Sequence, residues 1–122
     1  EMLRWWTPVM NFRRTATIDT TIAGVSIKAG EKVVVSYISA NNDESVFDAP
    51  ERFDITRAPN KHLVFGHGPH FCLGAHLARV QMRTMFAELL ARTSWIELAG
   101  EPVRLTSNFQ RGMKKLPITW SV

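Results

Sequence analysis

The feature that most constrains this chain of 122 residues is its one cysteine, Cys72, near the end of a loop rich in glycine. The loop comprises residues 65–74, and its glycines and Pro69 predict a compact turn with unusual backbone angles. A stretch without proline follows, and residues 73–92 are predicted to form the longest helix of the chain. Cys72 is therefore expected where a loop meets a helix N-terminus, a place that favours an anionic sulfur.

Three chemistries suit a cysteine in this setting, because the loop argues against a merely buried, apolar role. His67, His70 and His76 could join Cys72 around zinc, although their crowding is unlike the paired spacing of structural zinc sites. A neighbouring histidine could instead serve as the base for a nucleophilic cysteine. Haem iron is the third alternative, with the sulfur as ligand and His70 near a propionate. Gly74 would then let a flat ligand approach the backbone closely.

The remaining sequence predicts a mixture of helix and antiparallel strands. Residues 1–6 indicate the end of a helix, because Thr7-Pro8 stops the helical pattern. A tight hairpin turn is expected at residues 28–31, and residues 41–44 are expected to cap a short helix. The long helix carries an apolar stripe that predicts core packing, and it consists of Ala78, Met82, Met85, Phe86 and Leu89. The β-prone runs are residues 15–18, 25–27, 32–38, 95–98, 103–105 and 116–120.

Composition and charge restrict the classes of partner. The hydrophobic share of 45% and charged share of 21% are ordinary for a globular protein. The net charge is +4, but the basic pairs Arg13-Arg14 and Lys114-Lys115 are too short for a nucleic-acid-binding arm. No run approaches the ~20 apolar residues that span a membrane. A single cysteine allows no internal disulfide, and with no visible signal peptide the expected location is cytoplasmic.

Residues 65–74 resemble the cysteine-ligand loop of the cytochrome P450 haem-thiolate monooxygenases, F-x-x-G-x-H/R-x-C-x-G, at every fixed position. Glu1-Met2-Leu3-Arg4 is similar to the E-x-x-R helix of this family, and Pro50-Glu51-Arg52-Phe53 to its P-x-R-F segment. The three motifs stand in the family's order, and the resemblance extends over essentially all of residues 1–122. It implies the C-terminal haem-binding part of the mainly α cytochrome P450 fold, a fragment with small antiparallel sheets and one long helix after the cysteine loop.

The resemblance also implies roles for individual residues. The cofactor would be haem b, with Cys72 as the axial ligand of its iron. Phe65 would pack beside the sulfur and the haem, while His70 and Arg14 would bind propionates, with Arg13 as the rival of Arg14. Gly66 and Gly74 of the loop would also be cofactor-binding residues, and Gly74 matches the last fixed glycine of the motif. The family's salt-bridged structural triad would consist of Glu1, Arg4 and Arg52.

The activity implied is the insertion of one oxygen atom from O2 into a hydrophobic small molecule, with a lipid or sterol as the candidate substrate. Substrate-pocket positions would be Val9 and Met10, and also Phe109 and Gln110 near the C-terminus. A ferredoxin or flavodoxin-type electron donor would dock on basic residues, with Lys61, Arg79 and Arg83 as candidates. Two alternatives from other classes are a non-catalytic haem-binding or electron-transfer module and a small zinc-binding domain.

In the family, the oxygen-activating helix lies upstream of the E-x-x-R helix, so it would fall outside these 122 residues. A polypeptide of residues 1–122 alone is therefore expected to be inactive and to bind haem weakly or not at all. Apolar surface left exposed on such a fragment would favour self-association.

Overall fold

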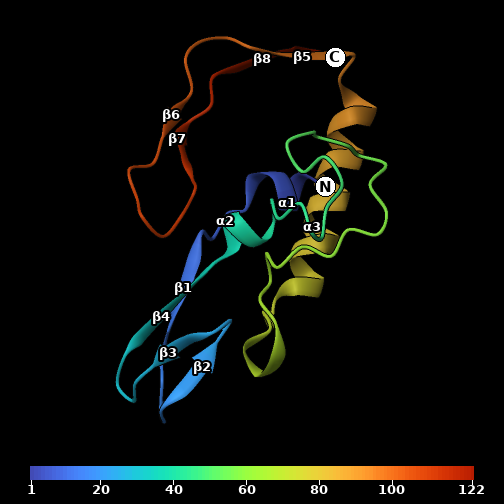
Figure 1. The fold of residues 1–122 in the computed structure, drawn as a ribbon. Coiled ribbons are helices and arrows are strands. Elements are labelled where there is room, and N and C mark those ends of the chain that lie inside the picture. The colour runs from blue at the N-terminus through green and yellow to red at the C-terminus, as the bar shows by residue number, and fades with distance from the viewer. The chain divides into compact units, whose positions relative to one another are not determined.

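The structure, a computed structural model, describes all of residues 1–122. The chain divides into two compact units (Figure 1). Unit 1 consists of Glu1–Val64 together with Asn108–Gln110, and unit 2 consists of Phe65–Ser107 together with Arg111–Val122. Each unit combines helix with two-stranded antiparallel ladders, which confirms the predicted mixed fold with small antiparallel sheets and one long helix.

Unit 1 contains two ladders and two short helices. Strand β1 pairs antiparallel with β4, with Asn11 opposite Ser36 and Thr15 opposite Lys32. Strands β2 and β3 form a separate hairpin, and α2 follows directly on β4 (Figure 1). The elements of unit 1 are α1 (Met2–Trp6), β1 (Asn11–Thr15), β2 (Thr20–Ile22), β3 (Val25–Ile27), β4 (Lys32–Ser36) and α2 (Tyr37–Ala40).

The strand pairing of unit 1 differs from the prediction in two respects. The first strand ends at Thr15, where the prediction began it, and residues 17–19 form a bend and coil before β2. The turn at residues 28–31 does form, with Gly30 at a φ of 89°, but it joins β3 to β4, which pair with other strands. The hairpin turn lies instead at Ala23-Gly24, where both residues have positive φ, as tight hairpins require.

The short helix expected after Asn41 lies before it. Ser36 is the N-cap of α2, since its hydroxyl oxygen accepts a hydrogen bond from the Ser39 N–H at 3.2 Å. Asn41 is the C-cap residue and is completely buried. The prediction was wrong because no helix begins at residues 41–44, and the Asn41 side chain belongs to a buried network.

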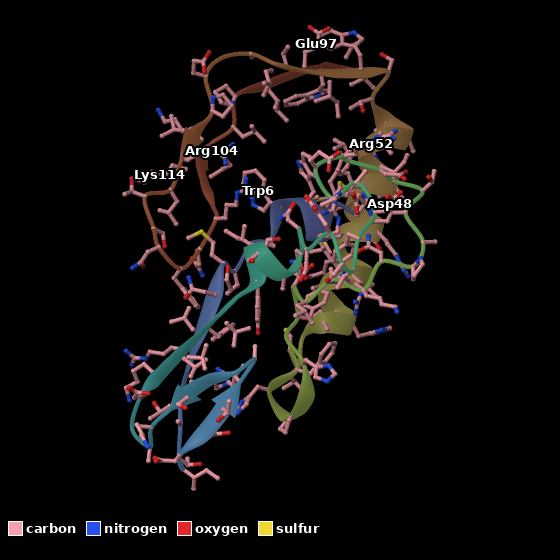
Figure 2. All side chains as sticks on the ribbon, viewed as in Figure 1. Trp6, Asp48, Arg52, Glu97, Arg104 and Lys114 are labelled. Carbon is pink, nitrogen blue, oxygen red and sulfur yellow. The ribbon has the colours of Figure 1, made fainter.

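Unit 2 begins with the cysteine loop and contains the longest helix. The predicted helix is confirmed, although Gly74 is its N-cap and the first helical residue is Ala75. Figure 2 shows Glu97 on β5, Arg104 on β6 and Lys114 on β7. Strand β5 pairs with β8, and β6 with β7. The elements of unit 2 are a 3-10 turn (Gly68–His70), α3 (Ala75–Arg92), β5 (Trp95–Leu98), β6 (Val103–Arg104), β7 (Met113–Lys115) and β8 (Ile118–Ser121).

Few apolar side chains are buried in either unit. Unit 1 buries Tyr37, Phe47 and Val64, and unit 2 buries Ala75. The predicted core role of the α3 stripe is therefore not realised within this chain: Met85 is 56% exposed, and the other members of the stripe are half-buried. The most completely buried side chains are polar, and they are Arg4, Thr7 and Asn41 of unit 1.

Candidate functional site

The cysteine loop is a closed turn that presents Cys72 at the entrance of α3. Gly66 and Gly68 have φ values of 74° and 70°, a left-handed conformation that other residues adopt only with strain. The Cys72 N–H donates to the Phe65 carbonyl at 2.8 Å, which joins the two ends of the loop. The Cys72 carbonyl in turn accepts from the Ala75 N–H at 3.2 Å, at the start of the helix. The loop thereby fixes the cysteine backbone while its side chain is exposed.

Several residues close to Cys72 in the sequence are apolar and exposed. Phe71 is 52% exposed, Leu77 is 60% exposed and Leu73 is fully exposed. A methyl group built on Gly74 would meet only the Cys72 Sγ, at 3.9 Å, and the φ of Gly74 is −83°. Neither the backbone nor internal packing thus requires glycine at this position. An open thiol, apolar neighbours and an empty space over Gly74 fit a flat, largely apolar ligand that binds through sulfur.

Phe65 connects the loop to α3. Its ring lies 6.3 Å from the Phe71 ring, at an interplanar angle of 60°. The Arg79 guanidinium carbon lies 4.5 Å from the centroid of the Phe65 ring, within the range of cation–π contacts. The expected place of Phe65 beside the sulfur is compatible with this geometry, because its carbonyl binds the Cys72 N–H.

The histidines of the loop do not form a metal site with Cys72. His67, His70 and His76 are all exposed, and no three histidine, cysteine or acidic side chains converge anywhere in the chain. The four-ligand arrangement considered for zinc is therefore absent. His70 ends the 3-10 turn two residues before Cys72, so it remains available to a ligand group beside the loop.

Arg13 and Arg14 lie on β1 of unit 1, opposite Val34 and Val33 of β4. Successive residues of a strand point to opposite faces, so only one of the two arginines faces any given side of the ladder. Both are exposed, and the Arg14 guanidinium lies 5.8 Å from the Phe12 ring centroid. Their role at a propionate stays a prediction.

A buried ionic cluster occupies the centre of unit 1. The Arg4 side chain has no exposed surface, and its Nη2 and Nε donate to the two carboxylate oxygens of Glu1 at 2.6 and 2.8 Å. The remaining donor capacity of Arg4 goes to the backbone carbonyls of Asn41, Pro50 and Arg52. Hydrogen bonds from Arg4 lower the pKa of Glu1 from 4.5 to about 2, although burial opposes this shift.

The third charged side chain of the cluster is Arg57, which corrects the expectation that it is Arg52. Arg57 Nε lies 3.3 Å from Glu1 Oε1, and the side chain is 9% exposed. The Arg52 side chain is exposed, and only its backbone carbonyl takes part, as an acceptor from Arg4 and Arg57. Figure 2 shows Arg52 and Asp48 on the irregular segment beside α1; the Asp48 carbonyl accepts from Arg57 at 2.6 Å.

The expected substrate-pocket residues come together in unit 1, although the sequence places them a hundred residues apart. Val9 and Gln110 form an antiparallel bridge, and the Met10 N–H donates to the Phe109 carbonyl at 2.9 Å. The Phe109 ring packs edge-on against Phe12, with centroids 5.5 Å apart. The four residues thus form one structural element beside the start of β1.

Two residues of these networks were not found in the sequence. Arg57 follows the P-x-R-F segment by four residues, and the alternation of acid and arginine around it was the available signal. Asn41 joins three segments: its amide donates to the Thr7 hydroxyl at 3.0 Å, and its side-chain oxygen accepts from the Leu63 N–H at 2.7 Å. No sequence signal separates Asn41 from its exposed neighbour Asn42.

An exposed cysteine fixed by a glycine loop at the start of a long helix, and a buried Glu–Arg pair on α1, are both features that the resemblance to haem-thiolate proteins predicts. The chain belongs to the cytochrome P450 family, whose sequence profile matches residues 1–122.

Several characterised proteins are similar to the chain. It is 49% identical over 121 residues to cytochrome P450-terp of a Pseudomonas species and 49% identical over 122 residues to a methyl-branched lipid omega-hydroxylase of Mycobacterium tuberculosis. It is 46% identical over 123 residues to a steroid C26-monooxygenase of Mycolicibacterium smegmatis. These matches cover 99% of the chain but only 28%, 28% and 31% of the three relatives.

Solved structures agree in fold. A Mycobacterium marinum cytochrome P450 in complex with pseudoionone is 51% identical, with a TM-score of 0.92, and the match covers 97% of the chain and 28% of that protein. CYP109E1 from Bacillus megaterium, in complex with testosterone, is 42% identical with a TM-score of 0.95 and coverages of 99% and 34%. The expected family and fold are thereby confirmed. None of the helices is both long and apolar enough to cross a membrane.

Proposed function

We propose that the whole protein is a haem-thiolate monooxygenase that inserts one oxygen atom from O2 into a hydrophobic small molecule. Cys72 is the residue of this chain that holds the haem b iron. The observation that carries the proposal is the exposed Cys72 side chain, fixed by the bond between its N–H and the Phe65 carbonyl. When bound, the haem supplies oxygen activation, and a thiolate ligand favours cleavage of the O–O bond.

The other site residues of unit 2 would bind and orient the haem. Gly74 leaves space for the ligand plane above the helix N-terminus, and Phe65 holds the loop closed. Gly66 provides the left-handed backbone that turns the loop toward the cysteine. His70 carries a ring N–H that would donate to a propionate. Arg14, with Arg13 as its rival, would bind the other acidic group of the cofactor from unit 1.

The substrate class is a lipid or sterol. Support comes from the relatives, named for activities on a methyl-branched lipid and a steroid, and from solved structures that contain pseudoionone and testosterone. Val9, Met10, Phe109 and Gln110 are the residues of this chain that we propose to border the substrate, since the bridge between them fixes their positions.

The electron donor is a ferredoxin or a flavodoxin-type protein. An acidic partner suits the net charge of +4 and the basic side chains of α3. Arg83 is exposed, whereas Arg79 is partly covered and stacked on Phe65, so Arg83 is the stronger docking residue. Lys61 is an exposed candidate in unit 1.

The test is an absorption spectrum of the whole protein with haem, reduced under carbon monoxide. A strongly red-shifted Soret band is expected, and it should disappear in Cys72→Ala but persist in His76→Ala, an exposed control four residues away. Metal analysis should give iron. A band that persists in Cys72→Ala, or zinc in place of iron, would refute the proposal. A thiolate band without oxidation of any lipid or sterol by a reconstituted donor would favour a non-catalytic haem protein.

A further inference from the structure

One positive charge in unit 2 is held in a fixed place next to the cysteine loop. The Arg79 guanidinium carbon lies 4.5 Å from the Phe65 ring centroid, closer than the 5.3 Å separating Arg4 from Phe47. Arg79 lies one turn after the buried Ala75 on α3, so both project from the same side of the helix. Its side chain is partly covered, in contrast to Arg83, one turn further along.

Phe65 holds both Arg79 and Cys72. Its ring carries the Arg79 guanidinium, and its carbonyl accepts the Cys72 N–H at 2.8 Å. The same ring also packs against Phe71, the residue before Cys72, with ring centroids 6.3 Å apart. A shift of the Phe65 ring would therefore also displace the Cys72 backbone, which carries the sulfur.

The charge of Arg79 has no partner of opposite sign. Arg79 makes no ion pair, and the single carboxylate of α3, Glu88, is bound to Arg92 at 2.6 Å. The first turn of α3 contains no acidic residue. A charge that is partly desolvated and held in place acts on its neighbours more strongly than a mobile charge in water.

We propose that Arg79 is a positioning residue of the thiolate site. It clamps the Phe65 ring and places a fixed positive charge beside the cysteine loop, which favours the reduced and more negative state of the site. This role rests on the proposed function, because a redox-active group on Cys72 is what responds to the charge. It is separate from partner docking, since it acts in the absence of any donor protein.

The test is the midpoint potential of the haem-loaded whole protein, measured without a redox partner. Arg79→Met should lower the potential by about 30 to 60 mV, a threefold to tenfold shift in the reduction equilibrium. Arg79→Lys keeps the charge but loses the planar stacking group, so its potential should lie between those of Arg79→Met and the unsubstituted protein. Arg83→Met removes an exposed charge of the same helix and should leave the potential unchanged.

A second series tests the clamp itself. In a Phe65→Leu background, Arg79→Met should shift the potential less than in the unsubstituted protein. Equal shifts in Arg79→Met and Arg83→Met, an unchanged potential in Arg79→Met, or an undiminished shift in the Phe65→Leu background would overturn the inference. If Arg79→Met does not retain haem, the test rests on Arg79→Lys. An Arg79→Lys potential equal to that of the unsubstituted protein would refute the clamp.

The carbon monoxide spectrum separates this inference from the proposed function. Absence of the thiolate band in the unsubstituted protein would refute the proposed function and, with it, the role of Arg79. A normal thiolate band together with an unresponsive potential would refute the role of Arg79 alone.

Discussion

Among single residues, Arg4 imposes the strictest requirements on its neighbours. Its side chain has no exposed surface, and it donates to both oxygens of Glu1 and to three backbone carbonyls. A charge is buried without great cost only when it is paired and its hydrogen bonds are satisfied. The segments that supply these acceptors are therefore held around α1 by one guanidinium group.

Replacement of the two arginines near this cluster should have unequal effects. Arg57→Ala removes hydrogen bonds to Glu1 and to the carbonyls of Asp48 and Ala49, so it should lower the free energy of unfolding by about 2 kcal/mol. Arg52→Ala keeps the backbone acceptor and should cost less than about 0.5 kcal/mol. Urea unfolding measures both, and equal losses would show that the Arg52 side chain shares the cluster.

The stability of the chain should depend on pH through Glu1. Its pKa is about 2 in the folded state and 4.5 as the reference value, so the unfolded chain binds the proton more readily. The stabilisation is complete above pH 4.5 and is lost as the pH falls toward 2, by on the order of 3 kcal/mol. Unfolding measured across this window should lose this dependence in Glu1→Gln. The exposed control Glu44→Gln should retain it.

Sequence motifs identified the Glu1–Arg4 pair and Cys72, but not the third member of the cluster. The P-x-R-F pattern drew attention to Arg52, because a motif records residue types and not the direction in which each side chain points. In the folded chain the Arg52 carbonyl faces Arg4, while the side chain of Arg57, five residues later, reaches Glu1. Only the course of the irregular segment decides this, and no local periodicity encodes it.

At the scale of elements, two glycines of the cysteine loop should behave differently when replaced by alanine. Gly68 has a φ of 70° with open space around it, so Gly68→Ala should cost about 1 kcal/mol of stability through backbone strain. Gly74 has an ordinary φ and a single contact at 3.9 Å, so Gly74→Ala should leave the stability of the haem-free protein nearly unchanged. Its effect should appear instead as weakened haem binding in a titration. Unaltered haem affinity would show that the space over Gly74 is not used.

The long helix and the strands at residues 25–27 and 95–98 could be predicted, because a periodic apolar pattern or a β-prone run determines them locally. Strands β2 and β7 were missed, since Thr20–Ile22 and Met113–Lys115 are short and their pairing depends on the turns that follow or precede them. The position of α2 was also missed, because Ser36 and residues 41–43 are all of types that cap helices, and α2 begins after Ser36.

At the scale of the whole molecule, a polypeptide of residues 1–122 should self-associate. On α3, Leu77, Val80, Met85 and Leu90 are all exposed, and unit 2 buries only Ala75 among its apolar side chains. Exposed apolar surface of this extent favours association in water. Sedimentation velocity should show a mass that rises with concentration, and Leu77→Ser with Leu90→Ser should reduce it. A monomer at all concentrations, with stoichiometric haem, would contradict this expectation.

Thr7 and Asn41 are far apart in the sequence, yet each supplies a hydrogen-bond partner that the other needs. Thr7 ends α1 with a φ of 45°, a strained conformation for a β-branched side chain. Its buried hydroxyl donates to the Arg4 carbonyl at 2.6 Å and accepts from the Asn41 amide at 3.0 Å. Glycine at position 7 would relieve the strain but leave the Asn41 amide without an acceptor. A substitution at either position therefore leaves a buried polar group at the other without its partner, so the two positions should tolerate replacement together better than singly.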